Sequence, residues 1–511
     1  MYHAMSIQRK HILSLDAFLA FLEQNNQLVR ITRPVSTVLE MTEILKRLVE
    51  RGGPAVIFEK PQQDDGSISP IPVLANLFGT VERTAWGLGC EQGALRALGQ
   101  DLAFLKQPTP VHGFKEAIDK FPQLKSVLSM KPNIVRSAPA QAQVFTGKDI
   151  NLQNLPVMTC WPGEPAPLIT WPLVITRPPD IEDTSAYNIG IYRMQVQGKN
   201  SALMRWLAHR GGAQHHRQWA ARGKDMPVAV AIGTDPATIL AAVTPIPDNL
   251  SEYHYAGLLR KKRLDLVPAK TVPLMVPADA QIILEGTVSA SDTAPEGPYG
   301  DHTGYYNTVE PFPVFTLSAI TMRKNPIYLS TFTGRPPDEP SVIAEGLNEV
   351  FIPLLQQQFP EITDFWLPPE GCSYRIGVVA IKKKYPGHAR RIMMGLWSWL
   401  AQFSYTKFLI VVDDDINARS WPDIMWAIST RADASRDLMV VENTPIDYLD
   451  FASPQSGLGG KLGIDATNKT GAETNREWGK PIHMDEDIIR KIDKIWAQLG
   501  LPGKPDQENQ T

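Results

Sequence analysis

The sequence predicts a multidomain protein of mixed α+β and α/β class, with a β-rich central segment between two α/β units. Three observations predict this. The chain has 511 residues, which is more than one ordinary hydrophobic core contains. Helix-like and strand-like patterns alternate near both ends, whereas short strand-like runs separated by turn residues fill the middle. Proline-containing stretches at 130–143 and 334–340 lie where the pattern changes.

The first unit, residues 1–130, is predicted to be a small α/β domain. Apolar residues recur at helical spacing over 15–22, and Ser14 is a suitable cap in front of them. A second apolar stripe covers 41–49, and Gly52 suits the position just past a helix end. Residues 54–58 then read PAVIF, which is typical of a strand.

The central unit, residues 144–333, is predicted to be mainly β. Strand-like runs occur at 168–176, 188–197, 227–233, 281–290 and 312–320. A helix is expected near 235–243. Such a series of short strands is typical of a β-barrel or β-sandwich with inserted helices.

The last unit, residues 341–511, returns to an α/β rhythm. Helix-like 391–403 precedes strand-like 407–412, and helix-like 423–431 precedes strand-like 438–441. The chain closes with a helix whose apolar stripe is formed by Ile488, Ile492, Ile495 and Leu499. We expect a second α/β domain here.

Composition excludes several classes of protein. The formal net charge is −3, which argues against a dedicated nucleic-acid surface. The three cysteines are far apart and show no C-x-x-C spacing, so a reducing cytoplasm is the simplest compartment. No secretory signal is recognised at the N-terminus. The apolar stretch 392–412 is interrupted by Gln402, Ser404 and Lys407, and we interpret it as a helix followed by a buried strand.

The segment EGPYGDHTGYYN places two acids, Glu296 and Asp301, in a stiff glycine- and proline-containing loop. The glycines and proline exclude a regular helix, so loop geometry decides where the acids point. If both acids faced one cavity, burial and mutual repulsion would raise one pKa and create a proton donor beside an ionised partner. The alternative is a tight turn with solvated acids.

Two further segments could bind anions. Residues 204–212 contain Arg205, His209 and Arg210 beside a glycine pair, which suits close approach to a phosphate. A strand end with solvated arginines is an equally good interpretation. SGLGGKLG, residues 456–463, contains Lys461 but departs from both familiar phosphate-loop patterns, so a structural glycine turn is the default.

Possible metal ligands give no decisive pattern. Asp413, Asp414 and Asp415 follow an apparent buried strand, where α/β folds bind ligands, but charged residues also end strands that reach water. Asn188, His209 and Glu252 are scattered, and spacing alone does not select them. Oxygen and imidazole ligands of this kind would suit Mn²⁺ or Mg²⁺ better than zinc. No nucleophile-elbow pattern supports covalent acyl chemistry.

Taken together, these segments resemble the UbiD decarboxylases. The resemblance runs from about residue 15 to residue 496, and it is closest to the members of ubiquinone synthesis that act on 3-polyprenyl-4-hydroxybenzoate. Long motifs such as EGPYGDHTGYYN make it specific. The matching segments are MTCWP, LITWPL, NIGIYRMQ, MRWLAHRGG, DPATILAAVTPIPDNLSEY, APEGPYGDHTGYYN, TGRPPDE, LPPEGCSYR, TKFLIVVDDDIN and ENTPIDYLDFASP.

The resemblance implies a fold and a set of cofactors. The implied fold is a small N-terminal α/β domain, a central split β-barrel that binds the flavin, and a C-terminal α/β domain that helps to build oligomers, either hexamers or dimers. The implied cofactors are prenylated FMN, a Mn²⁺ ion that joins its phosphate to the protein, and K⁺ or Na⁺. A flavin prenyltransferase would be the source of the modified flavin.

The resemblance also implies site residues. Asn188, His209 and Glu252 would hold the metal. Arg193, Glu296 and Asp301 would form the catalytic trio, with Asp301 as the proton donor. The modified flavin would contact Ile191, Tyr192, Arg193, Arg205, Trp206, Leu207, Arg210 and Gly211, with Lys461 as a further contact of its phosphate.

The implied reaction is the non-oxidative decarboxylation of 3-polyprenyl-4-hydroxybenzoate to 2-polyprenylphenol. Losing CO₂ from an aromatic ring requires an electron sink, which a cofactor supplies. Arg193 can orient the substrate carboxylate, Glu296 can hold Arg193, and Asp301 can deliver the replacing proton. Open alternatives are a decarboxylase of another aromatic or acrylic acid, a flavin reductase or oxidase, and a non-catalytic scaffold.

Two expectations concern geometry and location. Asn188 and Arg193 are an odd number of residues apart, so a regular strand would point them to opposite faces. We therefore predict an irregularity near Gly190, or separate surfaces of the cofactor served by each residue. A polyprenyl substrate resides in the bilayer, so we expect a cytoplasmic protein that meets the inner face of the membrane peripherally.

Overall fold

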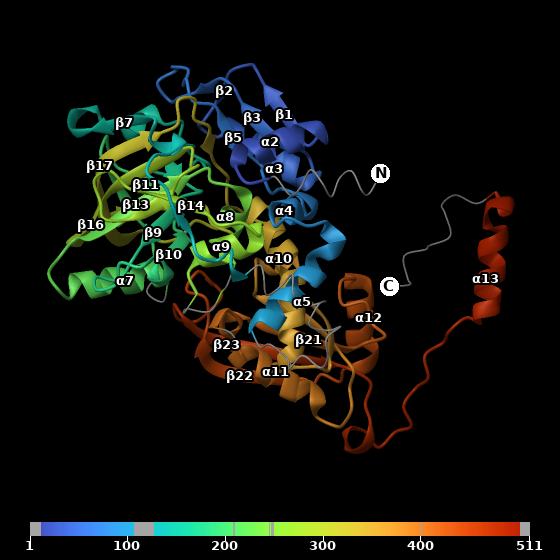
Figure 1. Cartoon of the computed structure of the whole chain (residues 1–511). Coiled ribbons are helices and arrows are strands. Elements are labelled where there is room, and N and C mark those ends of the chain that lie inside the picture. Colours follow the sequence, from blue (N-terminus) through green and yellow to red (C-terminus); the bar gives the residue numbers. More distant parts are fainter. Residues whose placement is uncertain are drawn as a thin grey trace.

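Three larger sheets, of four, nine and five strands, organise the part of the chain that the structure describes (Figure 1). The structure is a computed structural model, and it describes residues 12–106, 127–207, 210–244, 246, 250–399 and 401–500. The four-stranded sheet lies in the N-terminal part, the nine-stranded sheet in the middle, and the five-stranded sheet in the C-terminal part. This agrees with the predicted order of units along the chain, which is a small α/β unit, a β-rich segment and a second α/β unit.

The N-terminal elements form where the apolar pattern predicted them. The elements of this part are α2 (Leu15–Gln24), β1 (Leu28–Ile31), β2 (Val35–Ser36), α3 (Glu40–Glu50), β3 (Ala55–Phe58), β4 (Pro61–Gln62) and β5 (Val73–Ala75). Ser14 caps α2, because its side-chain oxygen accepts a hydrogen bond from Ala17 N at 3.2 Å. Gly52, just past α3, has a φ of +60°, which favours glycine.

The four-stranded sheet also takes a strand from far along the chain. Its order is β1, β3, β5 and β18 (Tyr328–Leu329), and β18 pairs parallel to β5. The chain therefore returns to the N-terminal unit after it leaves the central sheet. The hydrophobic core is continuous from this unit into the central sheet.

The central sheet is antiparallel in all its pairings. The order along it is β10, β9, β13, β16, β17, β12, β11 and β8, and β7 pairs with β17. Its strands are β7 (Gln143–Thr146), β8 (Leu168–Ile169), β9 (Leu173–Thr176), β10 (Asn188–Ile191), β11 (Met194–Val196), β12 (Ser201–Met204), β13 (Met226–Ile232), β16 (Ile282–Glu296) and β17 (Glu310–Met322).

This sheet must curl upon itself. β10 stands first in the order and β11 seventh, yet only two residues separate Ile191 from Met194. Six strand spacings across a flat sheet amount to about 29 Å. Three residue steps of chain reach only about 10 Å. The two ends of the strand order therefore lie close together, which gives a curled half-barrel.

Helices and a small sheet cover the curled sheet. The helices are α7 (Gly211–Ala220), α8 (Pro236–Ala241) and α9 (Glu252–Arg260). The expected helix near 235–243 is thus confirmed as α8. The small sheet has the order β15 (Met275–Pro277), β14 (Asp265–Pro268) and β6 (Asn133–Ile134).

One long helix, α10 (Glu339–Gln358), links the central part to the C-terminal part (Figure 1). It starts with a capping box, in which Asp338 and Ser341 satisfy each other's backbone N–H groups. It packs on α4 (Val81–Gly87) and α5 (Leu95–Lys106). Gly99 permits a close approach, since a Cβ at that position would lie 2.3 Å from the carbonyl oxygen of Val350.

The C-terminal sheet is mixed and has hydrophobic clusters on both faces. Its order is β19 (Ile362–Trp366), β20 (Ile376–Ile381), β21 (Phe408–Asp413), β23 (Leu458–Ala466) and β22 (Leu438–Pro445). The pairs β20–β21 and β21–β23 are parallel, and the two edge strands run antiparallel to their neighbours. One cluster contains residues of α11 (His388–Trp399), and the other contains residues of α12 (Trp421–Arg431).

The closing helix, α13 (Glu486–Ile495), stands apart from the rest of the molecule at the end of an extended segment (Figure 1). None of its residues is buried, and Ile488, Ile489 and Ile492 are all exposed. Within the described residues, none of the helices has the length and apolar character needed to cross a bilayer.

Candidate active site

Arg193 lies at the junction where the chain passes between the two ends of the curled sheet. β10 keeps a regular register through Gly190, and the break follows at Tyr192 and Arg193, which belong to neither β10 nor β11. The predicted irregularity therefore exists but lies after Gly190. Because of the break, strand alternation does not relate Asn188 to Arg193.

A tight hairpin fixes Asp301 relative to Glu296. Glu296 is the last residue of β16. Asn307 holds the base of the hairpin, since its backbone N donates to Tyr299 O at 3.0 Å and its Oδ1 accepts from Tyr299 N at 2.9 Å. Gly304 turns the chain with a φ of +79°, a conformation that favours glycine.

The structure brings Arg193, Glu296 and Asp301 together. Arg193 Nε donates to Glu296 Oε1 at 2.9 Å, and its Nη1 donates to Asp301 Oδ2 at 2.9 Å. A third contact joins Arg193 Nη2 to Asn307 Oδ1 at 2.7 Å. The guanidinium carbon also lies 5.3 Å from the centre of the Tyr299 ring, within cation–π range. Four groups thus hold one guanidinium in a defined orientation.

Glu296 is the buried centre of this network. Its side chain is 0% exposed, and it accepts hydrogen bonds from two arginines. Arg205 Nη1 donates to Glu296 Oε2 at 2.6 Å, and Arg205 Nη2 donates to the hydroxyl of Tyr448. The guanidinium of Arg205 also lies 4.9 Å from the centre of the Phe312 ring. A buried carboxylate is stable here because two cations compensate its charge.

Asp301 is ionised in this arrangement. Burial acts to raise its pKa, but hydrogen bonds from His302 and the charge of Arg193 outweigh burial and hold the pKa of Asp301 below its ordinary value. Its Oδ1 accepts from His302 N at 2.8 Å and from His302 Nδ1 at 2.6 Å. Asp301 therefore needs a change in its surroundings before it can carry a proton near neutral pH.

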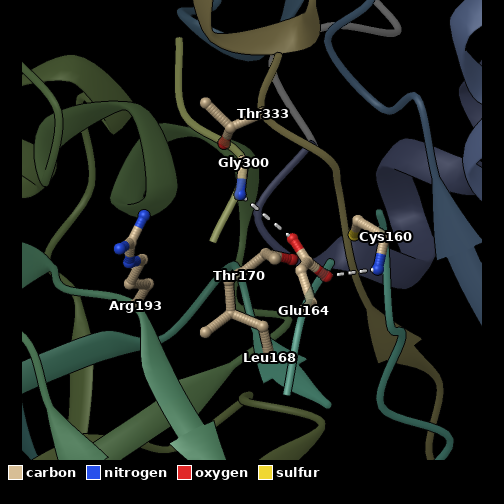
Figure 2. Close-up of a pocket in the computed structure, with 7 residues that line it drawn as sticks. All are labelled: Cys160, Glu164, Leu168, Thr170, Arg193, Gly300 and Thr333. Atoms are coloured by element: carbon tan, nitrogen blue, oxygen red, sulfur yellow. Dashed lines mark hydrogen bonds between the residues drawn. The ribbon is translucent and has the colours of Figure 1, made fainter. Parts of the chain in front are cut away.

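A third carboxylate, Glu164, approaches the same site (Figure 2). It lines a small cavity of about 30 Å³ together with Arg193 and Thr170. Its oxygens accept from Cys160 N at 2.6 Å and from Gly300 N at 3.4 Å. Burial raises the pKa of Glu164, although these hydrogen bonds and the charge of Arg193 oppose the rise.

A larger cavity also adjoins Asp301. Its volume is about 460 Å³. Aromatic and proline residues form much of its lining, including Trp161, Phe332 and Pro337, and Lys46 of α3 also lines it. A cavity of this size can receive an aromatic acid beside the Asp301 carboxylate.

The predicted metal and phosphate ligands lie together at the start of α7, as far as the structure describes them. Glu252 Oε2 accepts from the backbone N of Ile189 at 2.9 Å. Asn188 Nδ2 donates to the hydroxyl of Tyr192 at 3.3 Å. A Cβ at Gly211 would lie 2.0 Å from Asn188 Oδ1, so only glycine permits this approach. His209, the third predicted metal ligand, lies outside the described residues.

These residues fit a phosphate bound through a hard cation. Arg210 is the exposed N-cap of α7 and makes no side-chain cap, so the helix start offers a positive charge and N–H donors, one of which, Gly212 N, reaches the Tyr192 hydroxyl at 3.3 Å. Asn188 and Glu252 add oxygen ligands that suit Mn²⁺ or Mg²⁺. In the described ranges no group of three or more His, Cys, Asp or Glu side chains could hold a metal. The predicted set is different, because one of its three ligands, Asn188, is an amide and another, His209, lies outside the described residues.

The remaining predicted flavin contacts lie towards the two ends of the strand order, which the curl of the sheet brings close together. Ile191 ends β10, and Arg205 and Trp206 directly follow β12, with Leu207 next in the chain. Trp206 is buried and packs edge-to-face on Tyr192, with ring centres 6.1 Å apart. Arg205 contacts Glu296, and Tyr192 directly precedes Arg193, so these positions adjoin the Arg193 network.

Lys461 does not join this group. It lies on β23 in the C-terminal sheet, and its Nζ donates to the carbonyl oxygens of Ser404, Thr406 and Pro445. An ammonium has three donors, and these carbonyls use all three. In this arrangement Lys461 has no donor free for a phosphate, so its phosphate contact stays a prediction that the structure does not support. Burial lowers the pKa of Lys461 to about 8.

Replacing Lys461 with Met should lower the free energy of unfolding by about 3 kcal/mol, because one buried and two partly buried carbonyls lose their partner. The affinity for FMN should stay the same. Urea unfolding and FMN fluorescence titration measure the two quantities, and Lys480→Met, at an exposed position, is the matched control. A weaker FMN affinity with unchanged stability would restore the phosphate role.

Asp413, the last residue of β21, and Asp415 both pair with Arg431. Arg431 donates to Asp413 Oδ2 at 2.9 Å and to Asp415 Oδ2 at 2.7 Å. Asp413 also accepts from the backbone N of Asn468. The arginine bridges the two acids and ties α12 to the end of the sheet, so the structure favours a structural interpretation of these two acids over a ligand site.

Several residues of the network were not selected from the sequence. Asn307, Tyr299 and His302 lie inside EGPYGDHTGYYN, and Tyr448, Asp447 and Arg375 lie inside two other matched segments. Their position inside long segments that match the family could therefore have marked them as candidate site residues. Glu164 lies two residues after MTCWP, and only its place beside the small cavity reveals it.

Three family models match the chain in succession. The N-terminal domain of 3-octaprenyl-4-hydroxybenzoate carboxy-lyase matches residues 19–102. The Rift-related domain of the same enzyme matches residues 133–336, and its C-terminal domain matches residues 341–466. The matches together cover most of the chain and include the whole Arg193 network.

Solved structures of similar proteins share the fold. The UbiD-class enzyme HmfF from Pelotomaculum thermopropionicum, in complex with FMN, is 27% identical over 92% of this chain and 97% of its own, with a TM-score of 0.74. An evolved dimeric form of HmfF, in complex with prFMN, is 26% identical over 92% and 97%, with a TM-score of 0.73. Vanillic acid decarboxylase from Sedimentibacter hydroxybenzoicus, in closed form, is 26% identical over 95% and 98%, with a TM-score of 0.80.

Proposed function

The chain belongs to the UbiD family and is a decarboxylase, a carboxy-lyase that uses prenylated FMN, and we propose that it converts 3-polyprenyl-4-hydroxybenzoate to 2-polyprenylphenol in ubiquinone biosynthesis. The observation that carries the catalytic part of the proposal is the single guanidinium of Arg193 between the carboxylates of Glu296 and Asp301. The family models, which are named for this substrate, support the choice of substrate.

Arg193 binds the substrate carboxylate in this proposal. Its guanidinium can make a two-point contact with a carboxylate, which orients the bond to be broken. Glu296, shared with Arg205, keeps the guanidinium in place when the substrate arrives. The prenylated flavin, when bound, supplies the electron sink that an aryl carbanion requires.

Asp301 delivers the proton that replaces CO₂. An arriving substrate carboxylate competes for Arg193 and adds a negative charge, and both effects raise the pKa of Asp301 from its depressed value. The protonated acid then stands beside the ring, because Asp301 lines the 460 Å³ cavity. As CO₂ leaves, the proton of Asp301 passes to the ring carbon and the carboxylate returns to its contact with Arg193.

The cofactor site proposed here is the start of α7. Asn188, His209 and Glu252 would hold Mn²⁺, and Arg210 with Gly211 would receive the flavin phosphate, which the oxygen donors and the start of α7 described above support. A bound K⁺ or Na⁺ is part of the same proposal. The central split β-barrel supplies the flavin surface through Ile191, Tyr192, Arg205, Trp206 and Leu207.

The proposal extends to partners and location. A flavin prenyltransferase supplies the modified flavin, and the polyprenyl substrate is met at the inner face of the cell membrane. The exposed apolar residues of α13 support assembly with further copies of the chain, as a dimer or hexamer.

To test the proposal, the protein is loaded with prenylated FMN and Mn²⁺, and CO₂ release is followed with 3-polyprenyl-4-hydroxybenzoate of several tail lengths. We expect release to be stoichiometric with formation of the 2-polyprenylphenol and to stop when Mn²⁺ is removed with a chelator. A fully loaded protein that releases no CO₂ above background from any tail length would reject this substrate.

A second substrate class is favoured by one observation. Vanillic acid decarboxylase, which acts on a small aromatic acid, superimposes on this chain with a TM-score of 0.80. Unprenylated 4-hydroxybenzoate and vanillate therefore belong in the same assay. A higher kcat/KM for either small acid would make the chain a decarboxylase of small aromatic acids.

A further inference from the structure

His302 joins the proposed proton donor to the C-terminal part of the molecule. It follows Asp301 directly and gives Asp301 Oδ1 two hydrogen bonds, one from its backbone N and one from its ring Nδ1. The other ring nitrogen, Nε2, lies 3.0 Å from Arg375 Nη1. The imidazole thus stands between a catalytic carboxylate and an arginine 73 residues further along the chain.

Arg375 is itself held by the C-terminal sheet. It lies just before β20, and its Nη2 donates to Asp447 Oδ2 at 2.9 Å. Its Nη1 also donates to the carbonyl oxygen of Cys372 at 2.9 Å. Tyr374 donates its hydroxyl to the same Asp447 oxygen at 2.9 Å. Asp447, just after β22, is only 6% exposed, so this pair is a fixed part of the C-terminal unit.

The contact with Arg375 decides which ring nitrogen carries the proton. A guanidinium has donors and no acceptor, so Nε2 of His302 must accept. In a neutral imidazole the proton then sits on Nδ1, the nitrogen that faces Asp301. Arg375 therefore selects the tautomer that donates to the Asp301 carboxylate. Without Arg375, the ring could place its proton on Nε2 and turn a lone pair toward Asp301.

We propose that His302 is a positioning residue for Asp301, and that Arg375 and Asp447 of the C-terminal unit fix its tautomer and orientation. The inference rests on the proposed function of Asp301 as proton donor. It adds that the proton donor is correctly held only while the C-terminal unit keeps its contact with the hairpin.

The proposal has a defined electrostatic setting. The charged groups that face His302 are Asp301 in its own hairpin, Arg375 and Asp447 in the C-terminal unit, and Asp338 at the start of α10. Asp338 is occupied by backbone N–H groups of Gly334 and Ser341. Of the three acids, Asp301 alone accepts a hydrogen bond from the His302 ring, so loss of that ring acts mainly on Asp301.

The direction of the effect follows from the contacts. Hydrogen bonds from His302 lower the pKa of Asp301, so removing the ring must raise it. Losing one hydrogen bond to a carboxylate shifts the pKa of that carboxyl by about one to two units. This equals a change of about tenfold to a hundredfold in its acid dissociation constant. Raising the pKa of the donor should move the alkaline limb of the pH–rate profile to higher pH, since the protonated form persists longer.

The first measurement uses the cofactor-free protein. Infrared difference spectra between low and neutral pH report the protonated carboxyl of Asp301, identified by its loss in Asp301→Asn. We expect His302→Leu to shift the titration of this band upward by about one to two pH units. Arg375→Met should shift it in the same direction, whereas Thr303→Ala, in the same hairpin, should leave it unchanged.

The second measurement uses the loaded enzyme. His302→Leu should lower kcat by about tenfold to a hundredfold, with little change in KM and with the alkaline limb moved upward. His302→Asn should recover much of kcat, because its side-chain amide can donate from near the position of Nδ1. A histidine with only a structural role would instead lower kcat without moving the limb or the infrared band.

The outcomes separate this inference from the proposed function. Wild-type protein that is loaded but inactive would contradict the function and leave the infrared result standing by itself. An active wild type whose Asp301 band does not move in His302→Leu would overturn the inference. An unmoved band in Arg375→Met, with a moved band in His302→Leu, would overturn the part assigned to the C-terminal unit.

Discussion

Replacing Asp301 with Asn should lower kcat by a factor on the order of 10²–10⁴, the usual contribution of a positioned proton donor. Asn has nearly the same shape and can still accept from Arg193, so the cavity and the substrate contact should survive. It cannot deliver a proton, and its amide would face the Nδ1–H of His302 with a donor instead of an acceptor. Turnover should therefore fall much more than affinity.

The measurement is steady-state CO₂ release together with equilibrium binding of the substrate acid. Asp292→Asn is the matched control, because Asp292 is an exposed residue of the same strand, β16. The control should keep wild-type kcat. If Asp301→Asn kept more than a tenth of wild-type kcat, another group would have to donate the proton, and Glu164, with its raised pKa, would be the first to examine.

Glu296→Gln should be the most destabilising single substitution in the site. The carboxylate is completely buried between Arg193 and Arg205, so the neutral amide leaves two guanidiniums without their shared counter-charge. Removing one partner of a buried ion pair typically costs about 3–5 kcal/mol. We expect the free energy of unfolding to fall by about that amount and CO₂ release to be lost, since Arg193 is no longer held.

Urea unfolding of the cofactor-free protein, followed by tryptophan fluorescence and circular dichroism, measures this loss. Glu310→Gln is the control from the same pair of strands. Glu310 lies opposite Glu296 in the register, is 41% exposed on its side chain and is 4.0 Å from Arg205. An exposed pair contributes about 0–1 kcal/mol. Equal losses for the two substitutions would refute the special role of Glu296.

The sequence predicted individual helices and strands better than it predicted which of them pair or pack together. Apolar periodicity and the Ser14 cap give α2, and the DPATILAAV segment gives α8. The division at 1–130, 144–333 and 341–511 stays a prediction. The four-stranded sheet takes β18 from residues 328–329, and one core continues from the N-terminal unit into the central sheet. Such pairing depends on contacts between distant segments, which local periodicity does not report.

The position of Arg193 shows the same limit. Strand alternation raised the question of how Asn188 and Arg193 could serve one site, but the answer lies in the partner strands. Up to Ile191 the chain pairs with β9, and from Met194, three residues later, it pairs with β8 and β12. Nothing local to NIGIYRMQ encodes that change. The resemblance to the UbiD decarboxylases selected Arg193, Glu296 and Asp301, and the structure brings these three together.

Lys461 shows a limit of carry-over by motif, because its contacts in the fold do not follow from its segment. SGLGGKLG looked like a candidate phosphate loop, whereas the segment forms β23 and the lysine fills its donors with backbone carbonyls. His302, Arg375 and Asp447 were not selected from the sequence, because no local pattern marks them. Each is an ordinary polar residue in its own segment, and only the fold joins residues 302, 375 and 447 into one chain of contacts.

The central claim is that Arg193, Glu296 and Asp301 act on an aromatic acid over a bound flavin. A crystal structure of the protein loaded with prenylated FMN and Mn²⁺ and soaked with a slow substrate acid tests it most directly. We predict the substrate carboxylate on Arg193, the Asp301 carboxyl within hydrogen-bond distance of the carbon that loses CO₂, and the flavin phosphate at the start of α7. An acid bound away from Arg193, or a flavin whose phosphate lies elsewhere, would contradict the account.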